Sequence, residues 1–153
     1  MCYGRLMSDT VRTPLLDEQI CFALYNASRA LTARYRDLLD PLGITYPQYL
    51  VLLVLWEDGE VGVSAIGDRL HLESGTLSPL LRRLEAQGLV TRSRGGVDER
   101  AVRVGLTPAG DALRDQAAAI PDSICAATGL QLADLVALTD QIGGVADRVR
   151  AAT

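Results

Sequence analysis

Cysteines and tyrosines are the side chains of this chain that are most capable of chemistry. Cys21 lies in an apolar stretch, one residue before the only phenylalanine. A cysteine in a helix is usually a small hydrophobe without a chemical role. The other interpretation is a sensor thiol, because a thiolate stabilised by its neighbours is a nucleophile. Position alone favours the first interpretation.

The cysteine count excludes two common uses of cysteine. Cys2, Cys21 and Cys125 are too few and too scattered for a disulfide framework, and no C-x-x-C motif indicates a zinc or thioredoxin-like site. We assign Cys2 no role. His71 is expected in a turn, since no partner ligands surround it. We therefore expect neither a metal nor another cofactor.

Composition predicts one globular domain, since 48% of the residues are apolar and 22% are charged. No apolar run approaches the ~20 residues of a membrane span, and the N-terminus lacks a signal-peptide pattern. These features predict a cytoplasmic protein with no membrane partner, in which the cysteines rest as thiols.

The charge distribution points to a local nucleic-acid surface. The net charge of −4 argues against binding by the whole surface. From Arg82 to Arg103, however, six arginines stand against three acidic residues, a local net of +3. The chain has no lysine, for which genomic base composition is the simpler explanation.

Two N-terminal helices are predicted first. Apolar residues recur at spacings of three or four over 14–39, with Pro14 suited to the first helical position. Asp40 to Gly43 ends this helix. Thr45 is the expected N-cap of a second helix that continues through Trp56. That helix is apolar nearly all round, so it should be the buried centre of the domain.

The next segment matches a helix-turn-helix followed by a hairpin. A short helix capped by Ser64 or the residue before it, a turn at 71–73 and a helix over 74–85 are predicted. Two strands, 89–92 and 102–106, then enclose a polar, glycine-rich tip. Each piece alone could be an ordinary surface element, but their order indicates a winged helix.

In a winged helix the second helix of the pair enters the major groove of DNA, and an arginine of the wing reaches the minor groove. Arg100 could also simply pair with Asp98, and we expect it to do both. The residues predicted to face DNA are Ser74, Gly75, Thr76, Ser78, Pro79, Arg82, Arg94, Asp98 and Arg100.

The remaining chain should form a dimer interface. Thr107 caps a helix that Pro121 interrupts or kinks, and a last helix runs over about 131–150. Their apolar surface exceeds what a small winged helix can cover. We expect these helices and the first helix to join two copies, which would read a palindromic double-stranded operator with half-sites ~34 Å apart.

The predicted fold is therefore mainly α with a small β-hairpin, a winged helix-turn-helix flanked by dimerisation helices. The predicted parts are a flexible tail (1–13), helix 1 and its turn (14–45), the winged helix (46–107) and the C-terminal helices (108–153).

At this point the chain resembles the MarR family of bacterial repressors, over about 14–150. The wing carries Asp98-Glu99-Arg100 and then Leu106-Thr107, like the family's D-x-R…L-T pattern. The segments 21–25, 45–57 and 74–85 closely resemble the organic-hydroperoxide-resistance regulators of that family.

This resemblance implies a function and a set of site residues. Cys21 would be the thiol that reacts with an organic hydroperoxide, with Tyr35 and Tyr46 donating hydrogen bonds to its thiolate and Tyr25 shaping the pocket. Cys125 stands where some members carry a second cysteine that forms a disulfide between subunits. The chain would be a repressor that leaves its operator on oxidation, and not an enzyme.

Helix geometry restricts how these residues can meet. Cys21 and Tyr35 are fourteen residues apart, roughly 21 Å along one helix at ~1.5 Å per residue. If Tyr35 serves Cys21, it must therefore come from the partner's first helix, and Tyr46 has the same constraint. Tyr25, one turn from Cys21, can be a neighbour in the same chain. The helix dipole should add little, because Cys21 is expected beyond the first turn.

Several alternatives stay open. Tyr35 and Tyr46 could be half-buried packing residues, and Cys125 could be core filler. The whole protein could be a repressor that responds to a small molecule in a dimer crevice. A thiol peroxidase using Cys21 is a further alternative, although the helix-turn-helix and wing have no place in it.

Overall fold

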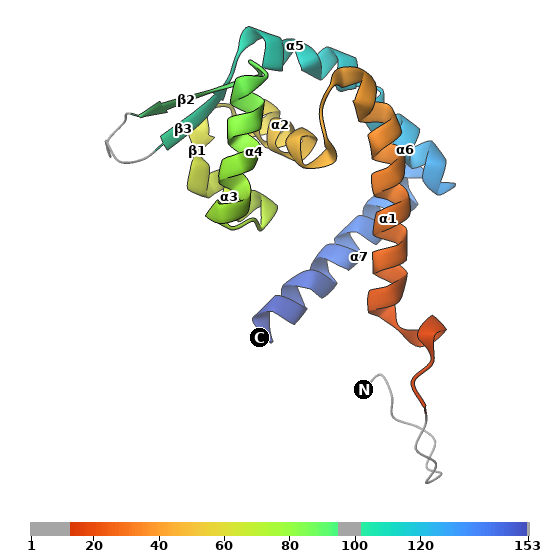
Figure 1. The fold of residues 1–153 in the computed structure, drawn as a ribbon. Coiled ribbons are helices and arrows are strands. Elements are labelled where there is room, and N and C mark those ends of the chain that lie inside the picture. The colour runs from red at the N-terminus through yellow and green to blue at the C-terminus, as the bar shows by residue number, and fades with distance from the viewer. Residues whose placement is uncertain (1–12, 95–101, 153) are drawn as a thin grey trace.

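The computed structural model describes residues 13–94 and 102–152, which form a mainly helical fold with one small antiparallel sheet (Figure 1). This is the predicted fold class. The predicted tail lies outside the described residues except for Thr13, and so does Cys2. The wing tip with Asp98 and Arg100 also lies outside them.

Helix α2 (Tyr46–Asp58) is the buried centre, as predicted. Thr45 is its N-cap residue, and Gln48 Oε1 accepts a hydrogen bond from the backbone N–H of Thr45 at 2.8 Å. Because the helix is apolar on nearly every side, neighbouring elements can pack on it from several directions. Its buried residues are Gln48, Tyr49, Val51, Leu52, Val54 and Leu55.

Helices α3 (Val63–Leu70) and α4 (Ser74–Ala86) form the predicted helix-turn-helix against α2. The predicted cap of α3 was wrong: Gly62, still extended at φ −68° and ψ 151°, holds the N-cap position. His71 lies in the turn in the left-handed conformation (φ 52°). Three leucines fix the inner side of α4, namely Leu77, Leu81 and Leu84.

The sheet contains β2 (Val90–Arg94) and β3 (Val102–Leu106), the two predicted hairpin strands. A third strand, β1 (Val61–Gly62), pairs with the other edge of β3 and was not predicted. Two residues are too short to show a strand pattern in sequence. β1 fixes the start of α3 to the sheet, with Val61 opposite Val104.

Helix α5 (Pro108–Ala117) begins at the predicted cap, with Thr107 Oγ1 accepting a hydrogen bond from the N–H of Gly110 at 3.0 Å. A Cβ at Gly110 would lie 2.0 Å from the carbonyl oxygen of Leu89, so the close approach needs glycine. Trp56 Nε1 donates to the carbonyl of Gly110 at 3.1 Å. These contacts fasten α5 to the winged helix.

The chain breaks at the predicted place before α6 (Ile120–Thr128), which has Pro121 in its first turn. Gly129, in the left-handed conformation, ends α6, and α7 (Leu132–Ala151) follows. Pro121 can stand in the first turn of α6 because the N–H groups of that turn have no helical acceptor, whereas a proline at an interior position would remove a backbone donor.

Helix α1 (Ile20–Leu39) starts six residues later than predicted from Pro14. Residues 16–18 form a separate 3-10 turn, η1 (Leu16–Glu18), and Gln19 after it is extended at φ −88° and ψ 109°. Gln19 Nε2 donates to the carbonyl of Leu15 at 2.9 Å. This local bond supports the break between η1 and α1.

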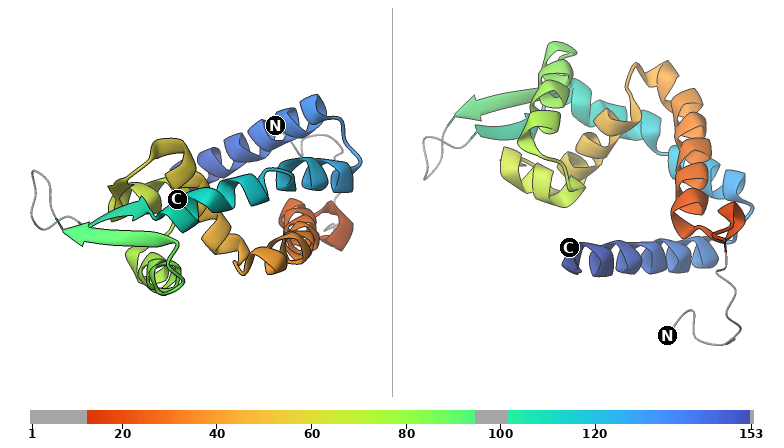
Figure 2. Two further views of the ribbon diagram at one scale, coloured as in Figure 1. Left: turned by 90° about the horizontal axis from the view of Figure 1, so that it is seen from above. Right: turned by 60° about the horizontal axis from the view of Figure 1, so that its bottom comes forward.

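Helices α1 and α6 lie at the end of the molecule opposite the β2–β3 hairpin, and α7 runs back below the winged helix (Figures 1 and 2). Leu39 is the only buried residue of α1, and no residue of α7 is buried, although both helices lie wholly within the described residues. Their large exposed apolar residues are Ile20, Phe22, Tyr25, Leu31, Leu132, Val136, Leu138, Ile142 and Val149.

Among the described residues, no single helix has both the length and the apolar composition needed to cross a bilayer. Only the segment Ile20–Leu42 taken together with α2, at a bend of 73°, passes the test of length and composition.

Candidate functional site

Cys21 is the second residue of α1, and its thiol is free and exposed. The prediction that Cys21 lies beyond the first turn was wrong, because η1 and Gln19 delay the start of the α-helix. The backbone N–H groups of a first turn have no helical acceptor and carry partial positive charge. Cys21 lies in the turn of α1 that carries these groups.

Three tyrosines form a cluster near the other end of α1. The ring centroids of Tyr35 and Tyr46 are 4.6 Å apart, and Tyr49 lies 6.0 Å from Tyr35. Burial, and then the neighbouring Tyr46 and Tyr49, raise the pKa of Tyr35 to about 12. Burial also raises the pKa of Tyr46. The phenols of this tyrosine cluster therefore keep their protons near neutral pH and can donate hydrogen bonds.

Cys21 and Tyr35 do not meet within one chain. Both lie on the continuous helix α1, fourteen residues apart, which is about 21 Å along its axis. Tyr46 packs on Tyr35, so it shares that separation. Tyr25, one turn from Cys21, is 59% exposed and has the guanidinium of Arg29 5.6 Å from its ring centroid. Of the predicted tyrosines, only Tyr25 is close to Cys21 along α1.

Cys125 lies in α6 as a free, half-buried thiol. Its Sγ is 3.7 Å from the carbonyl oxygen of Leu130, to which it can donate a weak hydrogen bond. No bond joins Cys125 to Cys21, since both thiols are free.

An open hollow of about 260 Å³ lies between α1 and α7. It is lined by Ile20, Leu24, Leu138, Gln141, Ile142 and Val145. Its walls are almost wholly apolar, and Gln141 is the one polar residue among them. A second hollow of about 250 Å³, with Tyr46 in its wall, lies at the junction of α1 and α2 and also includes Arg36 and Asp40.

The predicted DNA-facing residues of α4 share one surface. Ser74, Gly75, Thr76, Pro79 and Arg82 are exposed, and Ser78 is half-buried. Arg94, the last residue of β2, is also exposed. The surface carries hydroxyl groups and a guanidinium, which suit phosphates and base edges.

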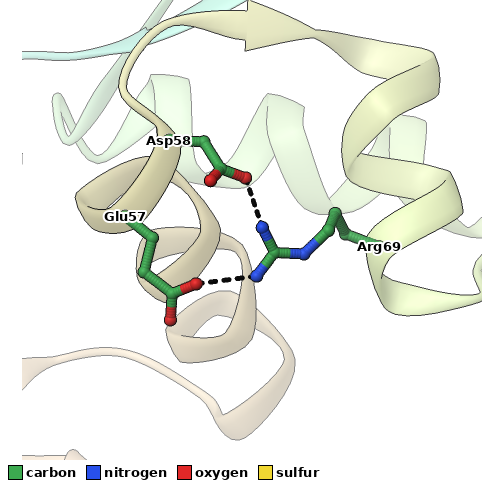
Figure 3. A network of polar contacts seen from close by, with 3 residues as sticks. All are labelled: Glu57, Asp58 and Arg69. Atoms are coloured by element: carbon green, nitrogen blue, oxygen red, sulfur yellow. Dashed lines mark hydrogen bonds and ion pairs between the residues drawn. The ribbon is translucent and has the colours of Figure 1, made fainter.

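Arg69 joins the first helix of the helix-turn-helix to α2 by two ion pairs. Its two terminal nitrogens contact Glu57 Oε2 at 2.7 Å and Asp58 Oδ2 at 2.5 Å (Figure 3). The hydrogen bond that Arg69 donates to Glu57, and then the charge of Asp58, raise the pKa of Arg69. Figure 3 shows that both acidic residues come from the end of α2, so this bridge ties α2 to α3.

Some residues of these sites were not predicted. Tyr49 joins the tyrosine cluster, and its spacing of three from Tyr46 places both rings on one side of α2. Ser64 lines a hollow of about 340 Å³ together with Ser78 and Arg92, next to the DNA-facing surface. Arg92 is held by Glu85, with Nε 2.8 Å from Oε2. Glu85 lies on α4 and Arg92 on β2, seven residues later. Because the two residues belong to different elements, no sequence pattern predicted this ion pair.

In the described parts of the chain, no three His, Cys, Asp or Glu residues gather closely enough to hold a metal ion.

Comparison with known proteins relates this arrangement to a family of regulators. A family model described as the MarR family matches residues 44–102. The organic hydroperoxide resistance transcriptional regulator of Bacillus subtilis (strain 168) is 51% identical over 109 residues, which cover 71% of this chain and 74% of that protein. The HTH-type transcriptional regulator TtmR of Methylorubrum extorquens is 47% identical over 136 residues, covering 89% and 70%.

Solved structures give the same relation. Reduced AbfR bound to DNA superimposes with a TM-score of 0.72 at 35% identity, covering 88% of this chain and 93% of that one. Disulfide-formed AbfR superimposes with a TM-score of 0.61 at 35% identity, covering 85% and 91%.

Proposed function

Because this chain belongs to the MarR family of transcriptional regulators, we propose that it is a dimeric repressor which releases its operator when an organic hydroperoxide oxidises Cys21. Its relatives are regulators, so a thiol peroxidase is not supported, and the protein is not an enzyme.

One observation carries the proposal: Cys21 is exposed in the first turn of a helix whose apolar side the chain leaves uncovered. A relative at 51% identity is named for resistance to organic hydroperoxides. A large uncovered apolar surface indicates an interface. We propose that the partner's α1 and α7 cover it in a homodimer.

The dimer would also complete the sensor. The tyrosine cluster lies too far from Cys21 along its own helix, so the partner's Tyr35 and Tyr46 are the donors that we propose for the thiolate. The raised pKa of Tyr35, about 12, keeps its hydroxyl protonated for this role. Hydrogen bonds to the charged form of a thiol favour that form.

The proposed reaction begins when the Cys21 thiolate attacks the outer oxygen of the hydroperoxide. The O–O bond breaks, the S–O bond forms, and the alkoxide that leaves takes a proton to become an alcohol. The resulting sulfenic acid can condense with the Cys125 thiol of the partner subunit, forming an S–S bond and releasing water. Each oxidised pair of thiols thus matches one reduced peroxide. The apolar side chains around Cys21 favour an organic peroxide over hydrogen peroxide.

On the DNA side, we propose that α4 enters the major groove and that Arg94, Asp98 and Arg100 belong to a wing at the minor groove. Two copies of α4 would read a palindromic double-stranded operator with half-sites ~34 Å apart. A disulfide requires Cα atoms within about 7 Å, so closing a wider gap must shift α1 and α6 of the two subunits. Such a shift would change the spacing of the two α4 helices.

The test is operator affinity before and after one equivalent of cumene hydroperoxide. Wild type should lose roughly 5- to 150-fold in affinity, the usual range of allosteric coupling. Cys21→Ser should bind the operator equally well under both conditions. An oxidant response that persists in Cys21→Ser would refute the sensor role.

Cys125→Ser separates oxidation from crosslinking and is the matched cysteine control. It should still lose the Cys21 thiol to oxidation, but without a covalent dimer on non-reducing gels. If the crosslinked dimer still forms in Cys125→Ser, Cys125 is not the resolving residue.

A second candidate function is favoured by the hollow between α1 and α7. Its apolar lining, with Gln141 as the polar group, suits a small aromatic or aliphatic ligand. In that case a ligand would release the operator under anaerobic, reducing conditions, and Cys21→Ser would respond like wild type.

A further inference from the structure

A buried amide lies between the tyrosine cluster and the DNA-reading helix. Gln48, 4% exposed, is the one buried polar side chain within the described residues. Its Oε1 accepts hydrogen bonds from the backbone N–H and the hydroxyl of Thr45, at 2.8 and 3.3 Å. Its Nε2 donates to Gln87 Oε1 at 2.7 Å. Leaving either end of a buried amide unpaired is unfavourable, so the geometry of this group is restricted.

Gln87 continues the path to α4. It is the C-cap residue of that helix, and its Nε2 donates to the carbonyl of Gly43 at 2.9 Å. Gly43 has φ +69° and lies at the corner between α1 and α2. The corner is thus bonded twice to the end of α4, once through Gly43 and once through Gln48. We call Gln48, Gln87 and the Gly43 carbonyl the amide link.

The same corner carries the tyrosine cluster. Tyr46 stands between Thr45 and Gln48 in the first turn of α2, and its ring packs on Tyr35 with 4.6 Å between centroids. Tyr46 and Gln48 lie in the same turn of α2, so a displacement of that turn by the tyrosine rings would move one end of the amide link. The other end of the link sits on α4.

We propose that the amide link passes changes in the tyrosine cluster to α4, so that Gln48 and Gln87 are positioning residues for DNA recognition. The physiological trigger of this coupling rests on the proposed function, in which oxidation of Cys21 disturbs the tyrosine cluster. The link itself is a property of the reduced protein and can be tested without oxidant. Coupled hydrogen bonds show their joint effect only when both partners are varied together.

The experiment is a double-mutant cycle on operator affinity in the reduced protein, with Tyr46→Leu and Gln87→Ala. Residues without a shared path give additive effects to within about twofold. Tyr46→Leu should weaken operator binding about fivefold in the wild-type background. In the Gln87→Ala background the same change should have an effect below twofold. Gln116→Ala, an exposed glutamine on α5, is the control and should leave the fivefold effect intact.

Gln87→Glu separates the link from general stability. Its carboxylate can still accept from Gln48 Nε2, but it cannot donate to the Gly43 carbonyl. It should restore part of the coupling that Gln87→Ala removes. A role in folding alone would instead lower the melting temperature without changing the ratio of affinities. If Tyr46→Leu does not fold, Tyr46→Met, which also removes the ring, takes its place in the cycle.

Two outcomes overturn the amide link: additivity within twofold, or no effect of the Tyr46 substitution on operator affinity. A non-additive cycle in a protein whose wild type ignores cumene hydroperoxide would keep the link and reject the redox function. If wild type responds to cumene hydroperoxide but the cycle is additive, the redox function stands and the amide link is rejected.

Discussion

The winged helix buries its apolar side chains within its own chain, whereas α1 and α7 leave most of theirs exposed. Around α2, side chains such as Leu52 and Leu84 are fully buried by their own chain. On α7 no residue is buried, and α1 buries only Leu39. Similar side chains thus stabilise the fold in one region and remain available for association in the other. This difference supports our proposal that the subunit interface lies in the region that carries Cys21.

The largest expected effect comes from the winged helix. Leu52→Ala should lower the free energy of unfolding by about 2–5 kcal/mol, because it removes buried methyl groups and leaves a cavity. Urea denaturation measures it. Val136→Ala, at an exposed position of α7, is the contrast, and its loss should be clearly smaller at low protein concentration. Equal losses would contradict the division into two regions.

A smaller effect is expected from a charge on α7. Leu138→Asp should weaken the dimer about 10²-fold, since an interface would have to bury an unpaired carboxylate at a cost of several kcal/mol. Analytical ultracentrifugation over a dilution series measures the dissociation constant. Asp134→Asn, in the first turn of α7, is a charge control that should leave the dimer intact. A Leu138→Asp variant with an unchanged dissociation constant would place the interface elsewhere.

The smallest effect concerns the tyrosine cluster at the boundary of the two regions. The pKa of Tyr35 is raised from 10.0 to about 12, so the unfolded chain loses this proton at lower pH than the folded protein. Stability should be unaffected below about pH 10 and should fall as pH rises from 10 to 12.

The variant that tests this is Tyr35→Phe, which should make the fall between pH 10 and 12 shallower in urea denaturation. Tyr25→Phe, at an exposed ring, should leave the slope as in wild type. An identical slope in Tyr35→Phe and wild type would mean that the ring is not shielded in solution.

The sequence was most informative where one local pattern decides the structure. The apolar character of α2, the caps at Thr45 and Thr107 and the break near Pro121 are local signals, and the structure has them. The start of α1 was predicted wrongly because the 3-10 turn and the extended Gln19 interrupt a periodicity that continues in the sequence. For the same reason Cys21 was predicted to lie beyond the first turn, whereas it is the second residue of α1.

Contacts between distant residues could not be predicted. The bonds from Gln87 to Gln48 and Gly43 join positions about forty residues apart, and glutamine spacing gives no sign of them. The bridge from Arg69 to Glu57 and Asp58 depends on how α3 crosses the end of α2. The proposed contacts of Cys21 with the tyrosines and with Cys125 join two subunits, which residue spacing within one chain does not describe.

The one fully buried side chain of α1, Leu39, is the last residue of that helix and lies far from Cys21. The twenty residues of α1 span about 30 Å, with buried Leu39 at the C-terminal end and the Cys21 thiol near the N-terminal end. If α1 tilted by about 10° about its C-terminal end, the Cys21 thiol would move by about 5 Å, nearly one helical pitch. If Cys21 is oxidised as we propose, a sideways displacement of its sulfur would therefore tilt α1 at the α1–α2 corner.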